Sequence, residues 1–180
     1  MTEAWFWQMA AFAAGTAPIV FLSWRSLGDV HSHGYYRFLA FEAIWALIIL
    51  NVSHWFVRPG SLLQAISWVL LIGSAVLVID GFLLLKRVGQ PPAENIEATT
   101  RLVAVGIYRF IRHPLYASLM LLCWGVYLKH VTYESSGMML LATLCLIFTA
   151  AVEERENRER FGDSYIQYMK QTKRFIPYVF

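Results

Sequence analysis

The residues with the greatest chemical potential lie in one short segment in the second half of the chain. Between residues 106 and 116 stand one glycine, two arginines, one histidine, one proline and two tyrosines. Gly106 permits a tight turn or the close approach of a ligand to the backbone. Pro114 suits the first turn of a helix, whose free amide groups favour an anionic group, and Arg112 adds positive charge. With the aromatic walls of Tyr108 and Tyr116, these residues could bind a ligand that carries a negative group.

A pair of carboxylates, Glu153 and Glu154, opens a charged tail some forty residues later. They could bind a polar ligand, or they could be the solvated exit of a helix. Glu154 and Arg158 stand four residues apart, as do Glu156 and Arg160, which is the spacing of ordinary ion pairs on a helix surface. Tyr and Arg are also enriched at membrane boundaries. On residue types alone, a binding site and a membrane boundary stay open as alternatives for both segments.

The composition is that of a membrane protein. Of 180 residues, 58% are hydrophobic and only 15% are Asp, Glu, Lys or Arg, and long apolar blocks exclude a soluble globular domain. The net charge of +3 comes from basic residues crowded into particular loops, so we expect no nucleic-acid partner. Cys123 and Cys145 lie inside apolar runs, where we expect small buried side chains and no disulfide.

Five apolar segments are expected to form helices, over residues 4–22, 35–56, 61–85, 115–128 and 138–152. The first three are long enough to span a bilayer. The last two have 14 and 15 residues, below the ~20 that a ~30 Å hydrocarbon layer requires. We therefore expect these two to form a tilted or partly re-entrant hairpin, closed by a polar turn over residues 129–137.

The polar end of the chain is expected to be helical as well. The fifth helix should continue beyond the membrane until Gly162, and a short amphipathic helix should follow around Tyr165 and Tyr168. The sequence thus predicts a single all-α integral membrane domain over residues 1–180. It has five transmembrane helices, the last two forming a hairpin, and a cytosolic C-terminal helical tail.

The positions of Lys and Arg predict the orientation, because basic residues in short loops are retained on the cytoplasmic side. With the N-terminus outside, thirteen of the fifteen Lys and Arg residues fall in inner segments. Only Arg58 and Lys129 fall in outer segments. We therefore expect the N-terminus outside, the C-terminus in the cytoplasm and a site that faces the cytoplasm.

Two motifs together point to a known family. The first comprises Gly106-Ile107-Tyr108 and Arg112-His113-Pro114-x-Tyr116, and the second comprises Glu153-Glu154, Phe161-Gly162-x-x-Tyr165-x-x-Tyr168 and Phe175-Ile176-Pro177. In this order and spacing they resemble the isoprenylcysteine carboxyl methyltransferase family and its phospholipid methyltransferase relatives. The resemblance covers residues 97–177, and the three preceding helices agree only in number and hydropathy.

The resemblance implies an integral membrane enzyme that binds S-adenosyl-L-methionine within residues 97–177, between the last two helices, the loop before them and the tail. It implies cofactor contacts from Val103, Gly106, Tyr108, His113, Pro114, Tyr116, Glu153 and Glu154. Family members methylate a prenylcysteine carboxylate or a phospholipid amine. The expected partners are therefore a lipophilic small molecule or lipidated substrate and the membrane lipids.

The chemistry of methyl transfer suits these residue types. Aligning donor and acceptor and excluding water can contribute up to ~7–11 kcal/mol. Aromatic faces can stabilise a sulfonium, Glu153 or Glu154 can bind the methionyl ammonium or ribose hydroxyls, and Arg112 or His113 can bind the carboxylate. A carboxylate acceptor needs no general base, whereas an amine or thiol needs one, from His113 or a glutamate. Arg174 is a candidate for holding an acidic group of the substrate, so the candidates for catalysis are Arg112, Glu154 and Arg174.

Several alternatives stay open. Glu42 and Asp80 lie inside apolar helices, where a carboxylate is either functional or paired, and Glu42 could face Arg37 or His33. The five histidines fall on both sides of the membrane, so we expect no metal site. A membrane reductase with a nicotinamide cofactor and a non-catalytic membrane module are the competing classes of function. The sequence predicts no oligomeric state.

Overall fold

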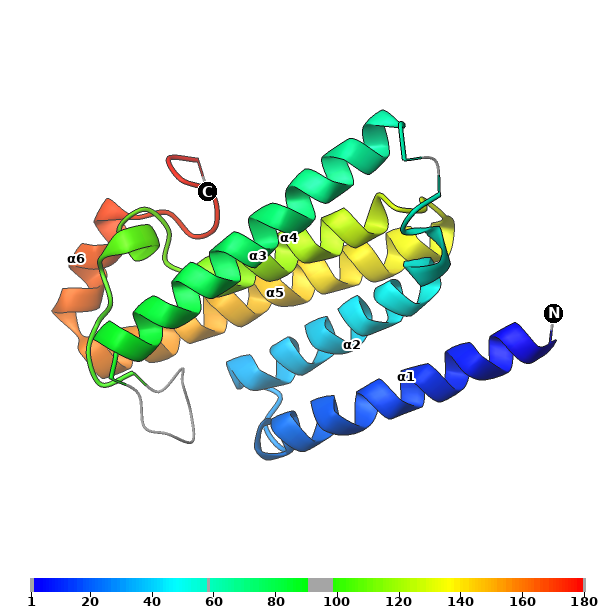
Figure 1. Cartoon of the computed structure of the whole chain (residues 1–180). Coiled ribbons are helices and arrows are strands. Elements are labelled where there is room, and N and C mark those ends of the chain that lie inside the picture. Colours follow the sequence, from blue (N-terminus) through cyan, green and yellow to red (C-terminus); the bar gives the residue numbers. More distant parts are fainter. Residues whose placement is uncertain (1, 58, 91–98, 180) are drawn as a thin grey trace.

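The structure is a computed structural model that describes residues 2–57, 59–90 and 99–179 (Figure 1). Arg58, for which the sequence predicts an outer position, lies outside the described residues. The described part of the chain forms the helices α1 (Thr2–Ser23), α2 (His33–Asn51), α3 (Leu62–Val88), α4 (Pro114–Tyr127), α5 (Tyr133–Phe161) and α6 (Asp163–Gln171). The all-α architecture is therefore confirmed for these residues.

The helices form a bundle with its polar elements at one end. In Figure 1, α2, α3, α4 and α5 run side by side, α1 flanks α2 at one edge, and α6 lies across one end of the bundle. We call this end the α6 end. The 3-10 helix η3 (Gly106–Arg109) lies at the same end, beside the C-terminal end of α3. The two motifs found in the sequence are thus brought to one end of the bundle.

Local sequence signals explain where the helices begin. The side chain of Ser61 accepts a hydrogen bond from the amide of Gln64 at the start of α3. Thr132 accepts one from the amide of Ser135 at the start of α5, and Pro114 is the first residue of α4. These side chains satisfy amides that have no partner inside the helix, and proline lacks the amide altogether.

Four helical stretches of the described residues are long and apolar enough to cross a membrane: Trp5–Ser26, His33–His54, Leu62–Val88 and Tyr133–Phe161. The expectation that the fifth helix is too short to span was wrong, because α5 begins at Tyr133, inside the predicted polar turn, and has 29 residues. Its predicted continuation to Gly162 is confirmed, since α5 ends at Phe161. α4 has 14 residues and rises only about 21 Å, which is less than a ~30 Å hydrocarbon layer. Among the described residues four helices are thus long enough to span, and the predicted count of five transmembrane helices is not confirmed.

Small side chains let the central helices approach closely. Ala40 and Ala43 of α2 and Ala142 and Ala150 of α5 are buried in the core, together with Leu47. Small residues at a helix interface allow backbone approach and dense packing, which is the main attraction between helices in lipid. Large apolar side chains on α1 and α3 are instead exposed. In a bilayer these exposed faces would contact lipid.

Hydrogen bonds close the end of the bundle opposite α6. The Asn51 side chain is fully buried, donates to the carbonyl of Val126 at 2.9 Å and accepts from the Ser135 hydroxyl at 3.0 Å. Ser67 of α3 donates to the carbonyl of Gly125 at 2.6 Å. Because these buried polar groups are paired, they tie α2 and α3 to the end of α4 and the start of α5 without the cost of an orphaned group.

Gly162 allows α5 to turn into α6. Its backbone has φ 57° and ψ −136°, a conformation that residues with a Cβ atom rarely adopt. No other atom lies within 4 Å of the position that a Cβ would take, so steric contact does not add to this strain. We expect Gly162→Ala to destabilise the protein by about 1–3 kcal/mol through backbone strain alone. The apparent melting temperature of the detergent-purified protein measures this effect.

Gly137 provides the matched control, because it lies inside α5 and also has no atom within 4 Å of a Cβ. Gly137→Ala should be neutral or stabilising by up to about 1 kcal/mol, since alanine favours a helix interior. Equal melting temperatures for Gly162→Ala and Gly137→Ala would show that the turn carries no strain.

Candidate functional site

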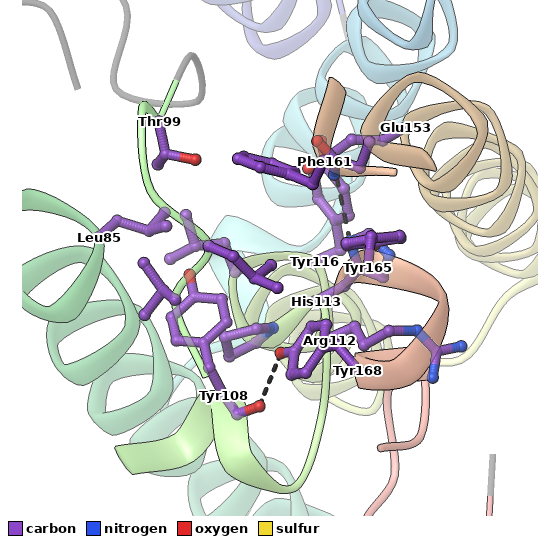
Figure 2. A pocket seen from close by; sticks show the side chains of 15 residues that line it. Leu85, Thr99, Tyr108, Arg112, His113, Tyr116, Glu153, Phe161, Tyr165 and Tyr168 are labelled. Carbon is purple, nitrogen blue, oxygen red and sulfur yellow. Dashed lines mark hydrogen bonds and ion pairs between the residues drawn. The ribbon is translucent and has the colours of Figure 1, made fainter. Parts of the chain in front are cut away.

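A pocket at the α6 end is built from both sequence motifs. Figure 2 shows Tyr108, His113 and Tyr116 from the first motif facing Glu153, Phe161 and Tyr165 from α5 and α6. The full lining comprises Leu85, Thr99, Leu102, Val103, Tyr108, Arg112, His113, Pro114, Leu115, Tyr116, Glu153, Asn157, Phe161, Tyr165 and Tyr168. Seven of the ten predicted site residues line this pocket, and they are Val103, Tyr108, Arg112, His113, Pro114, Tyr116 and Glu153.

Gly106, Glu154 and Arg174 do not line the pocket. Gly106 has φ +58°, and a Cβ at this position would lie 2.5 Å from Cδ1 of Leu84 on α3. The glycine therefore permits a left-handed turn packed closely on α3, which places Tyr108 in the pocket wall. The interpretation of Gly106 as a turn residue agrees with this geometry. Gly106 itself does not line the pocket.

Glu154 is the centre of a buried charge cluster. Its side chain is 3% exposed, and Arg112 Nε donates to its Oε1 at 2.8 Å. Arg174 donates to the same carboxylate from Nη2 to Oε2 at 2.6 Å and from Nε to Oε1 at 3.2 Å. The hydrogen bonds of Glu154 raise the pKa of the Arg174 guanidinium above its usual value, so this side chain stays charged. Both oxygens of Glu154 are thus occupied by arginines of two distant segments.

The interpretation of Glu154 as a solvated helix exit was wrong. Arg158 donates from Nε to the backbone carbonyl of Glu154, at 3.3 Å, instead of forming the expected surface ion pair. Glu156 contacts His33 of α2, with 2.6 Å between Oε2 and Nδ1. An exposed ion pair with the four-residue spacing does occur on α5, between Arg155 and Glu159 at 3.7 Å.

His113 lies between the two glutamates and two aromatic rings. It is 4% exposed, its Nε2 is 3.4 Å from Oε1 of Glu154, and its Nδ1 is 3.9 Å from Oε2 of Glu153. Its ring stacks on Tyr116 with 5.5 Å between centroids, and the ring of Phe175 lies 6.0 Å away. These contacts hold the imidazole in one orientation in the lining of the pocket.

Backbone pairing joins the loop before α4 to the tail. Arg112 N donates to the carbonyl of Lys173 at 2.8 Å, His113 N donates to that of Arg174 at 3.1 Å, and Lys173 N donates to that of Phe110 at 3.0 Å. Ile111 and Lys173 form an isolated parallel β-bridge. The first motif is therefore held against residues 173–174, which explains why residues about sixty positions apart in the sequence lie at one site.

Tyr168 fastens α6 to the same wall. Its hydroxyl donates to the carbonyl of Tyr108 at 2.6 Å, and this bond is drawn in Figure 2. Burial raises the pKa values of the Tyr165 and Tyr168 hydroxyls, so both stay neutral at physiological pH. α6 thus contributes two aromatic, uncharged groups to the pocket.

Sequence reasoning missed several residues of the wall, above all Asn157, Phe161, Tyr165 and Tyr168. A signal for two of them was present, because Glu153, Asn157 and Phe161 follow one another at four-residue steps and share one face of α5. Tyr165 and Tyr168, three residues apart, share the inner face of α6. Helical spacing from Glu153 onward would have extended the predicted site.

The two intramembrane carboxylates lie away from the pocket. Glu42 accepts a hydrogen bond at 2.8 Å from the hydroxyl of Thr16 on α1, while His33, one of its expected partners, pairs with Glu156. Asp80 is exposed on the surface of α3. No group of three His, Cys, Asp or Glu residues that could hold a metal ion occurs in the described parts of the chain.

The residue types of the pocket fit S-adenosylmethionine, since it offers aromatic faces, carboxylate and amide oxygens and the N-terminus of α4. The enclosed volume is only about 70 Å³, whereas pockets for small ligands usually measure roughly 300–1,000 Å³. A ligand of that size therefore requires the side chains of the pocket to move apart. Phe161, which is only partly buried at the end of α5, is placed to do so.

Comparison with known proteins assigns a family to the larger part of the chain. The family model described as phospholipid methyltransferase matches residues 62–164. Methanethiol S-methyltransferase 1 of Bradyrhizobium diazoefficiens is 31% identical over 75 residues, which cover 40% of this chain and 25% of that protein. Methanethiol S-methyltransferase of Pseudomonas deceptionensis is 25% identical over 144 residues, which cover 74% of this chain and 52% of that protein. The chain thus spans a quarter to about half of these relatives, and no solved structure matches it significantly.

The charge cluster predicts a large effect for Glu154→Gln. The substitution leaves Arg112 and Arg174 without their anionic partner in a site where Glu154 is almost fully buried. Removing one partner of a buried ion pair costs about 3–5 kcal/mol, so we expect a clear fall in the apparent melting temperature.

Glu159→Gln is the control, because it makes the same chemical change on the same helix in an exposed ion pair. Its melting temperature should equal that of the unsubstituted protein, since exposed pairs contribute little. If both variants melted alike, the cluster would have no structural role.

Proposed function

Because the chain belongs to the phospholipid methyltransferase family, we propose that it transfers a methyl group from S-adenosylmethionine to a lipophilic acceptor. The observation that supports this most directly is the pocket in which Arg112, His113 and Tyr116 meet Glu153 across the α6 end. The donor supplies a methyl group on a sulfonium: a nucleophile forms a bond to the methyl carbon while the carbon–sulfur bond breaks, and S-adenosylhomocysteine leaves with the electron pair. The residues of this chain have to bind the donor and the acceptor, orient them and exclude water.

We assign the binding of the donor to the residues that line the pocket. Glu153 and Asn157 lie one helical turn apart and present a carboxylate and an amide for the ammonium or hydroxyl groups. The rings of Tyr108 and Tyr116 provide faces for a sulfonium. The free amides at the start of α4 suit a carboxylate.

Glu154, Arg112 and Arg174 receive a different role from the one expected on sequence grounds. Because their charged groups bind one another, we propose that they position the pocket walls instead of contacting the reacting atoms. Arg112 also donates from Nη1 to the carbonyl of Met169 at 3.3 Å, which adds α6 to the cluster. Four segments of the chain are thereby held in register.

An apolar groove beside the pocket suits a lipophilic acceptor. It has a volume of about 580 Å³ and is lined by α3, α4, α5 and the tail segment 175–177. Ile111 and Ala117 of its wall flank the pocket residues 112–116, so the groove and the pocket share one short stretch of chain. The volume lies within the usual range for ligand pockets. The acceptor would reach this groove from the lipid that surrounds the helices.

The nucleophile of the acceptor determines whether the protein must remove a proton from it before methyl transfer. A carboxylate needs no base, whereas a thiol, as in the relatives named as methanethiol S-methyltransferases, has to lose its proton. His113 is the side chain placed to take it, because its Nδ1 lies 3.9 Å from the carboxylate of Glu153, which would stabilise the imidazolium.

We propose that the α6 end faces the cytoplasm, since basic residues in the described segments gather there. We expect cysteine labelling to report this directly. In Lys170→Cys on α6, a membrane-impermeant maleimide should react only after the cells are permeabilised. In Val131→Cys, between α4 and α5, it should react on intact cells. Cys123 and Cys145 are buried and give a low background. The opposite pattern would reverse the orientation.

Calorimetry with the detergent-purified protein tests the donor. We expect saturable binding of S-adenosylmethionine and S-adenosylhomocysteine and none of NADPH. Glu153→Gln should weaken binding about 10–100-fold, because a charge-assisted hydrogen bond contributes ~1.5–3 kcal/mol.

Glu159→Gln, on the exposed face of α5, should bind like the unsubstituted protein. Binding of NADPH alone would support a membrane reductase. If a folded sample bound none of the three ligands, the methyltransferase proposal would be wrong.

A further inference from the structure

The tail segment 172–177 stands between the pocket and the apolar groove. Arg174 reaches the carboxylate of Glu154 behind the pocket wall, whereas its neighbour Phe175 lines the groove. The bridge between Ile111 and Lys173 fixes the start of this segment, and the backbone bends over residues 174–176, so the two neighbouring side chains reach different sides. The tail therefore forms a thin wall with a charged side and an apolar side.

Phe175 is the side chain of this wall that lines the groove and also lies beside a pocket residue. It is 5% exposed, it lines the groove, and its ring centroid lies 6.0 Å from that of His113, which lines the pocket. Among the described residues, no residue lines both hollows. An acceptor in the groove consequently cannot reach the pocket until a side chain of the wall moves.

A rotation of Phe175 would open the contact between the groove and His113 of the pocket. Its backbone neighbours are fixed, because His113 N donates to the carbonyl of Arg174 and Arg112 N donates to that of Lys173. Its ring instead faces the groove, whose 580 Å³ offers space for a different rotamer. His113 is more tightly held, between Tyr116 and the two glutamates.

The groove also restricts the head group that can pass. Its lining includes no Asp, Glu, Lys, Arg or His among the described residues. Its two polar side chains, Trp124 and Thr143, are hydrogen-bonded to each other, with 3.3 Å between Nε1 and Oγ1. A phosphate moving through this groove would lose its hydration without a cationic partner, which is costly. A compact head group without a phosphate avoids that cost.

We propose that Phe175 is the gate between the groove and the pocket, and that it selects aliphatic acceptors with a compact, phosphate-free head group. This inference rests on the proposed methyl transfer and names the acceptor class for the same site. Phe175 is accordingly a specificity-determining residue, whereas Ile176 beside it lines the groove with a side chain that is 53% exposed.

The test uses the full chain in detergent, labelled S-adenosylmethionine and four C12 probes. The compact probes are 1-dodecanethiol, dodecylamine and dodecanoate, and the phosphate-bearing probe is dodecylphosphoethanolamine. We expect the unsubstituted protein to methylate at least one compact probe and to discriminate against dodecylphosphoethanolamine by at least about tenfold in kcat/KM. Methylation of the phosphate-bearing probe alone, or of no probe by protein that binds the donor, would overturn the proposal.

The gate itself is tested with the best compact probe and its α,α-dimethyl counterpart, which carries the same nucleophile on a bulkier head. Phe175→Ala should raise kcat/KM for the bulky probe relative to the slim one by about tenfold or more. Ile176→Ala should leave that ratio unchanged while raising KM for both probes. An unchanged ratio in Phe175→Ala would overturn the gate.

Two measurements keep this outcome separate from a failure of folding or of the proposed function. Calorimetric binding of S-adenosylhomocysteine should remain saturable in Phe175→Ala, because Phe175 does not line the pocket. If Phe175→Ala does not fold, Phe175→Leu keeps an apolar side chain and should still raise the ratio. If the unsubstituted protein did not bind the donor, the proposed methyl transfer, on which the gate depends, would be overturned instead.

Discussion

A single buried carboxylate determines how the polar end of this protein is assembled. Glu154 projects from α5 into a region from which water is excluded, and a charge there is tolerated only when it is paired and hydrogen-bonded. Its partners are Arg112 in the loop before α4 and Arg174 in the tail. These two ion pairs hold both non-helical segments against α5. The pocket, the groove and the wall between them all depend on this contact.

The elements could be predicted from the sequence because they depend on local patterns. Apolar blocks, Pro114 at a helix start and Gly162 at a helix end located the helices apart from the start of α5, and the first motif predicted most of one pocket wall. The start of α5 was missed because its first residues are polar and include Gly137. Thr132 followed by Ser135 is in fact a capping signal, and tertiary contacts of Ser135 with Asn51 stabilise the polar turn as helix.

The roles within the site could not be read from the sequence, because they depend on which charges meet. A glutamate four residues before an arginine predicts a surface pair, yet the carboxylate of Glu154 faces the interior and leaves Arg158 to a backbone carbonyl. The partner Arg174 lies twenty residues away, and only the pairing of residues 111–113 with 173–174 brings it close. Local spacing identifies a charged residue but not the distant segment that neutralises it.

The two hollows differ in a way that bears on the order of events. The groove already has the volume of a ligand site, whereas the polar pocket encloses about 70 Å³ and would have to expand around the proposed donor. Under the proposed function, part of the donor's binding free energy would be spent on separating stacked rings, among them Phe161 and Tyr165, whose centroids lie 6.4 Å apart. Because His113 stacks on Tyr116 and touches Phe175, rings displaced on the pocket side press on the wall that faces the groove. A donor that opens the pocket would thus also disturb the barrier to the acceptor, which couples the two ligands through packing alone.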